Sequence, residues 1–94
     1  MRDNHITKNT YFLVSRTQPK LSQEGKAQLI LADSFTHAAL QYSIYISDYF
    51  YHPVLNYEIT YIKQYIDHVT IRVICNLPEN YIRVLKLKVT KFEK

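Results

Sequence analysis

The amino-acid sequence predicts a single α+β domain, residues 1–94, in which one helix packs on one face of an antiparallel sheet of four to five strands, in the chain order β-β-α-β-β-β. One apolar stripe with helical spacing lies in the middle of the chain. The segments on either side of it are rich in β-branched and aromatic residues and lack that spacing. From residue 57 onward the apolar residues recur with a period of two, and two short breaks there are typical of hairpins.

The N-terminal third of the chain predicts two strands. Residues 1–9 are polar and are expected to form a loose arm. Thr10–Arg16 is β-branched and aromatic, which favours a strand. Residues 17–25 contain a proline and the only glycine of the chain, and therefore predict a loop. The short apolar run Ala27–Leu31 predicts a second strand, antiparallel to the first.

The middle of the chain predicts a helix from about Ser34 to Phe50. Either Asp33 or Ser34 can accept hydrogen bonds from the backbone N–H groups of its first turn. Its apolar stripe consists of Phe35, Ala38, Ala39, Tyr42, Ile46 and Tyr49. The helix is expected to end at His52-Pro53, because proline disfavours helix in the residue before it.

Three further strands are predicted, over residues 57–66, 69–77 and 81–92. A two-residue turn at Asp67-His68 pairs Ile66 with Val69, and a three-residue turn at 78–80 pairs Leu77 with Tyr81. Because directly opposite residues share a face, both turns define the same core side of the sheet. The predicted core residues are Ile62, Ile66, Val69, Ile71, Val73, Cys75, Leu77, Leu85, Leu87 and Val89.

The opposite face of this sheet is expected to combine cations with tyrosines. The candidate binding residues are Tyr57, Tyr61, Lys63, Tyr65, Arg72, Lys86 and Lys88. In the predicted register Lys63, Arg72 and Lys86 stand in one row across three strands, which favours a bound anion because like charges opposite each other repel. Cations between aromatic rings are typical of surfaces for single-stranded nucleic acid, where cations contact phosphates and rings stack on bases.

The net charge of the chain is concentrated at its C-terminal end. Residues 1–80 hold seven basic and seven acidic residues, whereas the last 14 residues hold five basic residues and one acidic residue, so the whole formal charge of +4 lies there. A concentrated basic segment attracts polyanions. Lysines also protect exposed edge strands from aggregation, and Tyr and Arg are enriched where proteins bind proteins. The pattern therefore fits nucleic acid, a protein partner or a solvated face.

Motifs for catalysis and for cofactor binding are missing from the sequence. The four histidines are 15 or more residues apart and there is one cysteine, so no metal-ligand spacing occurs. A single glycine excludes a glycine-rich phosphate loop. Cys75 alternates into the predicted core, where a thiol acts as a small apolar group. We therefore expect a non-enzymatic protein with no catalytic residues, no metal site and no cofactor.

The sequence also favours a cytoplasmic location. A lone cysteine is typical of a reducing compartment. Residues 1–8 lack the apolar region of a secretory signal, and no run of about 18 apolar residues occurs that could span a membrane. We expect no membrane partner.

The run LILADSFTHA, residues 29–38, resembles the strand-to-helix turn of uncharacterised small proteins of bacteria and phages, in which an Ala-x-Ser-Phe-Thr-x-Ala run follows a strand. The short, Tyr- and Ile-rich single domain is similar to phage-encoded inhibitors of CRISPR nucleases, the anti-CRISPR proteins. This resemblance implies binding to a host RNA-guided nuclease, which is a ribonucleoprotein, or to its guide RNA, in the bacterial cytoplasm and without a cofactor.

Two alternative functions remain open at this point. A structural protein would form a homodimer through Ile59, Ile74 and Val84 together with an exposed edge strand. A small ribonuclease toxin would use scattered Lys, Arg, Tyr and His side chains as acid–base groups. Toxins of that kind usually place their helices before the main sheet, whereas a hairpin comes first here.

Overall fold

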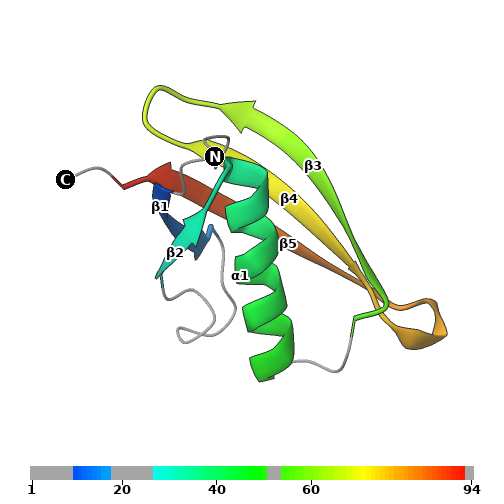
Figure 1. The fold of residues 1–94 in the computed structure, drawn as a ribbon. Coiled ribbons are helices and arrows are strands. Elements are labelled where there is room, and N and C mark those ends of the chain that lie inside the picture. The colour runs from blue at the N-terminus through cyan, green and yellow to red at the C-terminus, as the bar shows by residue number, and fades with distance from the viewer. Residues whose placement is uncertain (1–9, 18–26, 51–53, 93–94) are drawn as a thin grey trace, which may run out of the picture.

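The computed structural model describes residues 10–17, 27–50 and 54–92. Within these ranges one helix packs on one face of a five-stranded antiparallel sheet whose strand order is β2-β1-β5-β4-β3 (Figure 1). The elements are β1 (Thr10–Arg16), β2 (Gln28–Ala32), α1 (Phe35–Phe50), β3 (Asn56–Gln64), β4 (Val69–Asn76), a short 3-10 turn (Pro78–Asn80) and β5 (Ile82–Lys91). The α+β class and the order of elements are as predicted. The predicted arm, residues 1–9, lies outside the described residues.

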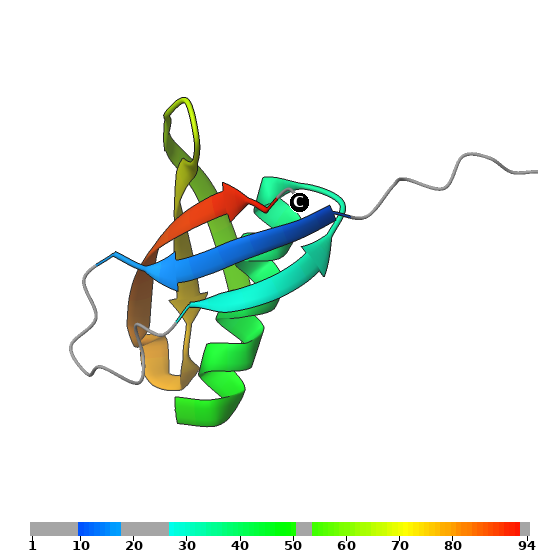
Figure 2. The same ribbon diagram turned by 90° about the vertical axis from the view of Figure 1, so that its left-hand side faces the viewer.

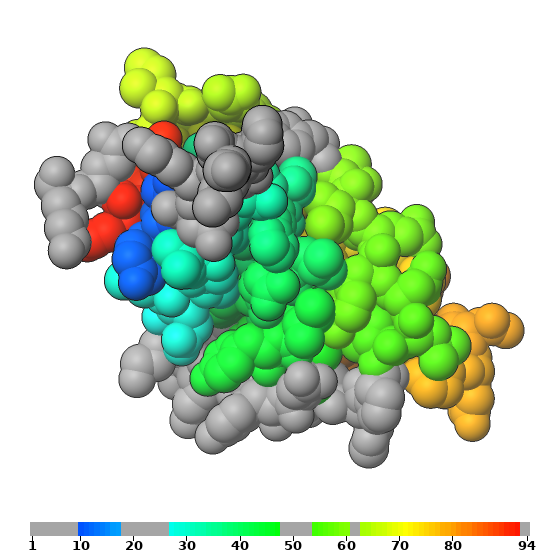
Figure 3. All heavy atoms as spheres, in the orientation of Figure 1, coloured from blue at the N-terminus to red at the C-terminus, as the bar shows by residue number. Residues whose placement is uncertain are grey.

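Helix α1 begins where the capping residues predict. The Oγ of Ser34 accepts a hydrogen bond from the backbone N–H of His37 at 3.1 Å, which pairs one of the N–H groups that have no partner inside the helix. Four residues of the predicted stripe, Ala38, Ala39, Tyr42 and Ile46, are fully buried. The helix contacts all five strands and covers the middle of one sheet face, with β2 on one flank and β3 on the other (Figure 3). No helix in the described ranges is long and apolar enough to cross a membrane.

The hydrophobic core fills the space between α1 and the sheet. Strands β4 and β5 supply alternate residues to it: Val69, Ile71, Val73 and Cys75 from β4, and Leu85, Leu87 and Val89 from β5, each at most 1% exposed. Phe12 and Val14 of β1 and Ala32 of β2 extend the core toward the other end of the sheet. Phe12 meets the Phe35 ring edge-on at 5.0 Å between centroids, which fixes the start of the helix against β1.

The β4–β5 hairpin has the predicted register. Leu77 donates its N–H to the carbonyl of Tyr81 at 2.8 Å, so three residues form the loop. The ladder then pairs Arg72 with Lys86, as expected. The loop reverses the chain through Glu79 and Asn80, which have φ angles of 63° and 66°. Asn tolerates this left-handed conformation, whereas Glu adopts it at a cost of about 1–2 kcal/mol.

The predicted register of β3 is wrong. Gln64, and not Ile66, pairs with Val69, so the β3–β4 loop has four residues, and a bulge between Tyr61 and Lys63 shifts the ladder once more. The combined shift is an odd number of residues, which reverses the faces along most of the strand. Ile59 pairs with buried Val73 and packs against the core, and Ile66, predicted to be buried, lies fully exposed in the loop.

The edges of the sheet are formed by β2 and β3. Strands β1 and β2 run across the front of the molecule in Figure 2, with β2 outermost and the hairpin of β3 and β4 behind them. The sheet twists strongly between these halves, as sheets of L-residues do. Strand β3 forms the other edge and contains the bulge.

Candidate functional site

The face of the sheet opposite α1 is here called the open face. Its membership follows from the ladder, because residues that pair directly lie on the same side of a sheet. The described residues of this face are Leu29, Leu31, Tyr11, Leu13, Ser15, Thr90, Lys88, Lys86, Val84, Ile82, Thr70, Arg72, Ile74, Asn76, Lys63, Thr60, Glu58 and Asn56, and the same alternation along β5 adds Phe92.

Four cations of the open face form a basic cluster, defined as Lys63, Arg72, Lys86 and Lys88. Arg72 pairs directly with Lys86, while Thr70 pairs with both Lys88 and Lys63 on either side of it. The cluster therefore occupies two adjacent rows on β3, β4 and β5, with strands about 5 Å apart. The prediction placed Lys63 in the row of Arg72 and Lys86; the β3 shift moves Lys63 one row along, into the row of Thr70 and Lys88.

Two acids among the described residues lie near the basic cluster, Glu58 on β3 and Asp67 in the β3–β4 loop, and the Lys88 charge helps to lower the pKa of Asp67. Within the described ranges no ion pair joins any of its four side chains to an acid, and all four are exposed. The acid closest in the ladder is Glu58, one row beyond Thr60 on β3, and its Oε2 accepts a hydrogen bond from the Nδ2 of Asn76 at 2.9 Å. The cations repel each other across the strands, so an anion bound between them relieves that repulsion.

Tyr65 is the tyrosine of the predicted site that stays beside the cations. The ammonium of Lys63 lies 5.0 Å from its ring centroid, within the range of a cation–π contact. The ring of His68 stacks on it at 4.5 Å and 14° between planes. Tyr65 therefore has a fixed position in the four-residue loop and is 44% exposed.

A second tyrosine of the predicted site, Tyr57, does not face the cations. It pairs with buried Cys75 and packs half-buried against the core. Tyr61 pairs with Ile71 in the ladder, one residue before the bulge. The register shift therefore separates Tyr57 from the face that carries Lys63.

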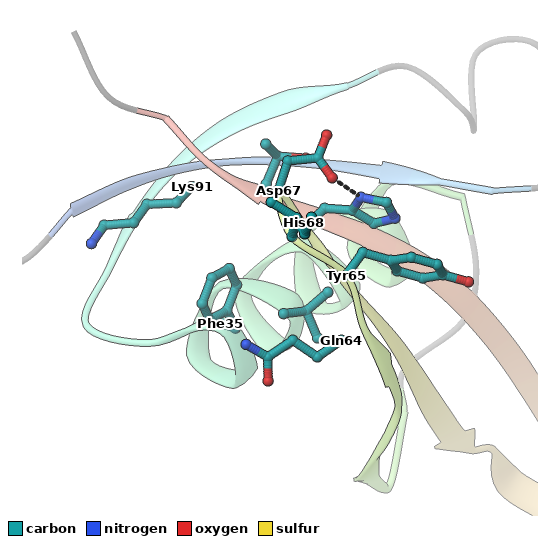
Figure 4. Close-up of a pocket in the computed structure, with 9 residues that line it drawn as sticks. Phe35, Gln64, Tyr65, Asp67, His68 and Lys91 are labelled. Atoms are coloured by element: carbon teal, nitrogen blue, oxygen red, sulfur yellow. Dashed lines mark hydrogen bonds and ion pairs between the residues drawn. The ribbon is translucent and has the colours of Figure 1, made fainter.

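A pocket of about 390 Å³ lies at the same end of the sheet, next to the β3–β4 loop (Figure 4). Phe35 and Lys91 line one side of it and Gln64, Asp67 and His68 the other. The Nδ1 of His68 and the Oδ1 of Asp67 are 2.8 Å apart, and this hydrogen bond lowers the pKa of the Asp67 carboxyl. Asp67 and His68 were predicted to form the tip of this hairpin, and the structure shows them hydrogen-bonded to each other, with the His68 ring stacked on the Tyr65 ring.

The described residues contain no group of three or more His, Cys, Asp or Glu side chains that could hold a metal ion. Cys75 is buried under α1, and burial raises the pKa of its thiol above the usual range. The Nδ1 of His37 lies 3.0 Å from the Oδ1 of Asp33 at the start of α1, and both side chains are exposed, so they form a local pair on the surface.

Sequence reasoning missed a second group on the open face, here called the apolar lane. It comprises Tyr11, Leu13, Leu29, Leu31 and Phe92, and each of these side chains is between 41% and 50% exposed. Leu31, Tyr11 and Phe92 form one row across β2, β1 and the end of β5, and Leu29 and Leu13 lie in the next. The run Tyr11–Val14 is apolar at every position, so the sequence of β1 did not indicate which of its side chains are exposed.

The chain matches no protein-family model, no curated protein and no solved structure.

Proposed function

We propose that this protein is a non-enzymatic binding protein whose basic cluster contacts the phosphate backbone of single-stranded RNA. The observation that carries the proposal is the arrangement of Lys63, Arg72, Lys86 and Lys88 in two adjacent rows of one exposed face, without ion-pair partners among the described residues. Phosphate contacts provide most of the affinity of sequence-independent nucleic-acid binding.

Single-stranded RNA fits this face better than a duplex does. Double-stranded RNA is read mainly by shape across its minor groove, whereas exposed bases of single strands stack on aromatic rings beside a basic surface. Tyr65 offers such a ring at the edge of the basic cluster, 5.0 Å from the Lys63 ammonium. One ring supports weak stacking with little sequence preference, so charge supplies most of the expected affinity.

The resemblance to phage-encoded inhibitors gives this proposal a concrete setting. The RNA would be the guide of a host RNA-guided nuclease in the bacterial cytoplasm, and occupying its phosphates would block the nuclease without any reaction. A ribonuclease would leave shortened RNA after incubation, whereas an inhibitor that only binds leaves the RNA intact.

The test is binding of a fluorescent single-stranded RNA, followed by anisotropy, with the wild type and two charge-matched variants. Arg72→Glu with Lys86→Glu removes two cations of the basic cluster. We expect an affinity loss of about a hundredfold, because two phosphate contacts are replaced by repulsion. Arg83→Glu with Lys91→Glu is the control: each double variant changes the formal charge by four, from +4 to 0, but these two residues occupy helix-side positions of β5.

The control should lose less than about tenfold in affinity, because Arg83 and Lys91 lie on the side of the sheet away from the basic cluster and act on the RNA through the long-range field. Equal losses in both double variants would contradict the proposal, since binding would then follow net charge and not this face. Shortening of the RNA by the wild type, seen on a denaturing gel, would replace the proposal with the ribonuclease alternative.

A further inference from the structure

The two edge strands of the sheet differ in how well they are protected against pairing with another chain. Edge strand β3 carries Glu58 and Lys63 and contains a bulge, which are devices that prevent an edge from pairing with another chain. Edge strand β2 has the sequence QLILA, with no charge, no proline and no bulge in its ladder with β1. Among the described residues β2 pairs with β1 alone.

The hydrogen-bond pattern shows which backbone groups of β2 point away from the sheet. Phe92 donates to the carbonyl of Tyr11, and Thr17 donates to the carbonyl of Lys86, so the odd-numbered residues of β1 bond to β5. The even-numbered residues of β1 therefore bond to β2, and Phe12 is paired with Ile30. It follows that Leu29 and Leu31 direct their N–H and C=O groups outward from the edge.

We propose that a second copy of this chain pairs with β2, antiparallel and about a two-fold axis at Ile30. This axis places Leu29 opposite Leu31 of the second copy, and Leu31 opposite its Leu29. Both residues have outward backbone groups, so the two pairs exchange four hydrogen bonds and join two sheets into one of ten strands. The interface is self-complementary, as a two-fold contact must be.

Side chains on the open face agree with this pairing. Leu29 is 50% and Leu31 49% exposed, and opposite residues of an antiparallel pair have Cβ atoms about 5 Å apart. Each leucine therefore gains a leucine neighbour from the other copy, next to the Tyr11 and Leu13 side chains of the apolar lane. On the helix side, Ile30 of one copy meets Ile30 of the other.

The charge distribution favours a second copy at this edge over one stacked on the open face. In the edge-paired dimer, Lys88 on β5 and its counterpart are separated by about five strand spacings, roughly 24 Å. Repulsion over that distance is screened at physiological salt, where the Debye length is about 8 Å. Stacking two open faces through Ile74 and Val84 would instead bring two basic clusters together. Because β2 contains no charged residue, it does not favour a charged partner over a second copy of this chain.

The test is the mass of the full chain, measured by sedimentation over a range of concentrations from micromolar to hundreds of micromolar. The wild type is expected to be a dimer that dissociates on dilution. Two double variants change the same two exposed leucines. Leu29→Lys with Leu31→Lys puts like charges opposite each other across the axis, and we expect dimerisation to weaken at least about tenfold.

Leu29→Lys with Leu31→Glu loses the same apolar surface but puts unlike charges opposite each other. It is expected to dimerise more tightly than the first variant, by about tenfold or more, because the register about Ile30 places each lysine opposite a glutamate of the other copy. Circular dichroism checks that both variants keep the fold. A wild type that stays monomeric throughout, or two variants that dimerise equally, overturns the proposal. RNA affinity of the monomeric variant is measured separately, so failure of this inference leaves the basic cluster to its own test.

Discussion

The open face of the sheet has two halves with opposite chemistry, and strand β5 passes through both. On β5 the face begins with apolar side chains, carries Lys86 and Lys88 in the middle, and ends at Phe92 beside the apolar lane. A polyanion would be attracted to the basic half and a second copy repelled by it, whereas the apolar half lies at an uncharged edge, where a second copy could pair without electrostatic cost. We therefore propose that one surface binds two kinds of partner side by side.

Substitutions on the surface of one half are expected to affect only the binding of that half. A substitution in the core face of β5 is expected to affect RNA binding and dimerisation together. The core face of β5 supports both halves, because Leu85, Leu87 and Val89 are all fully buried beneath them.

Substituting Leu87→Ala is expected to have the largest effect on both halves. Leu87 is fully buried and pairs with Ile71 on one side and Arg16 on the other. Removing its side chain lowers the free energy of unfolding by about 2–5 kcal/mol, through lost burial and the cavity left behind. Denaturant unfolding measures this change. Its neighbour on the open face, Lys88→Ala, is the control and should change stability by less than about 0.5 kcal/mol. Similar losses for both would mean that β5 does not separate a core face from an open one.

Salt concentration is expected to change RNA binding far more than dimerisation, and this is the second largest effect that we expect. If four phosphates are bound by the basic cluster, the affinity for single-stranded RNA falls by about fiftyfold between 50 and 200 mM salt, from a log–log slope of roughly −2.8. Dimerisation through uncharged β2 should change by less than about threefold over the same range, because the separated cations are already screened. Anisotropy and sedimentation on the same samples measure both. If dimerisation depended on salt as strongly as RNA binding does, the charges of the basic cluster would contribute to the dimer interface, contrary to the proposal.

The sequence was sufficient to predict the β4–β5 hairpin, because its pattern leaves one register. The middle of both strands alternates, with Arg72 and Lys86 on one face and Ile71 and Leu87 on the other. Pro78 starts a loop whose last residue, Asn80, tolerates a left-handed conformation. The pairing of Arg72 with Lys86, the centre of the candidate site, follows from these residues alone.

The register of β3 was harder to predict, because this strand has apolar residues in both phases. Tyr57, Ile59 and Tyr61 fit one phase, and Ile62 and Ile66 fit the other. The prediction took the second phase for the whole strand, whereas the structure keeps the first and inserts a bulge after Tyr61. Two adjacent apolar residues, Tyr61 and Ile62, mark that change of phase and are the available signal for a bulge.

The apolar lane depends on strand order, which local sequence does not specify. A period of two indicates that Leu29 and Leu31 share a side, but their exposure follows from the place of β2 at the edge of the sheet. The same run would suit a central strand covered on both faces.

Asp67→Asn is expected to have the smallest effect, and it tests how the loop positions Tyr65 next to the basic half. The hydrogen bond from His68 lowers the pKa of Asp67 below its ordinary value of 3.8, with the Lys88 charge as a lesser cause. Because the carboxylate form is favoured in the folded chain, its contribution to stability is present above the unfolded pKa and is lost as pH falls through the folded pKa. Asp67→Asn should therefore be slightly less stable than the wild type at pH 7, and the difference should shrink as the pH falls below 3.8 and through the lowered pKa of Asp67.

RNA binding should respond to the same substitution in the opposite direction. Removing a negative charge from the loop beside Lys88 and Lys63 raises the affinity for a polyanion, by about twofold for an exposed and screened group. Denaturant unfolding at pH 7 and pH 3 and RNA anisotropy at pH 7 measure the two changes. Lower RNA affinity of the variant at neutral pH would contradict this expectation. It would mean that the Asp67–His68 hydrogen bond contributes to RNA binding mainly by positioning the Tyr65 ring, and that stacking on this ring outweighs the effect of the Asp67 charge.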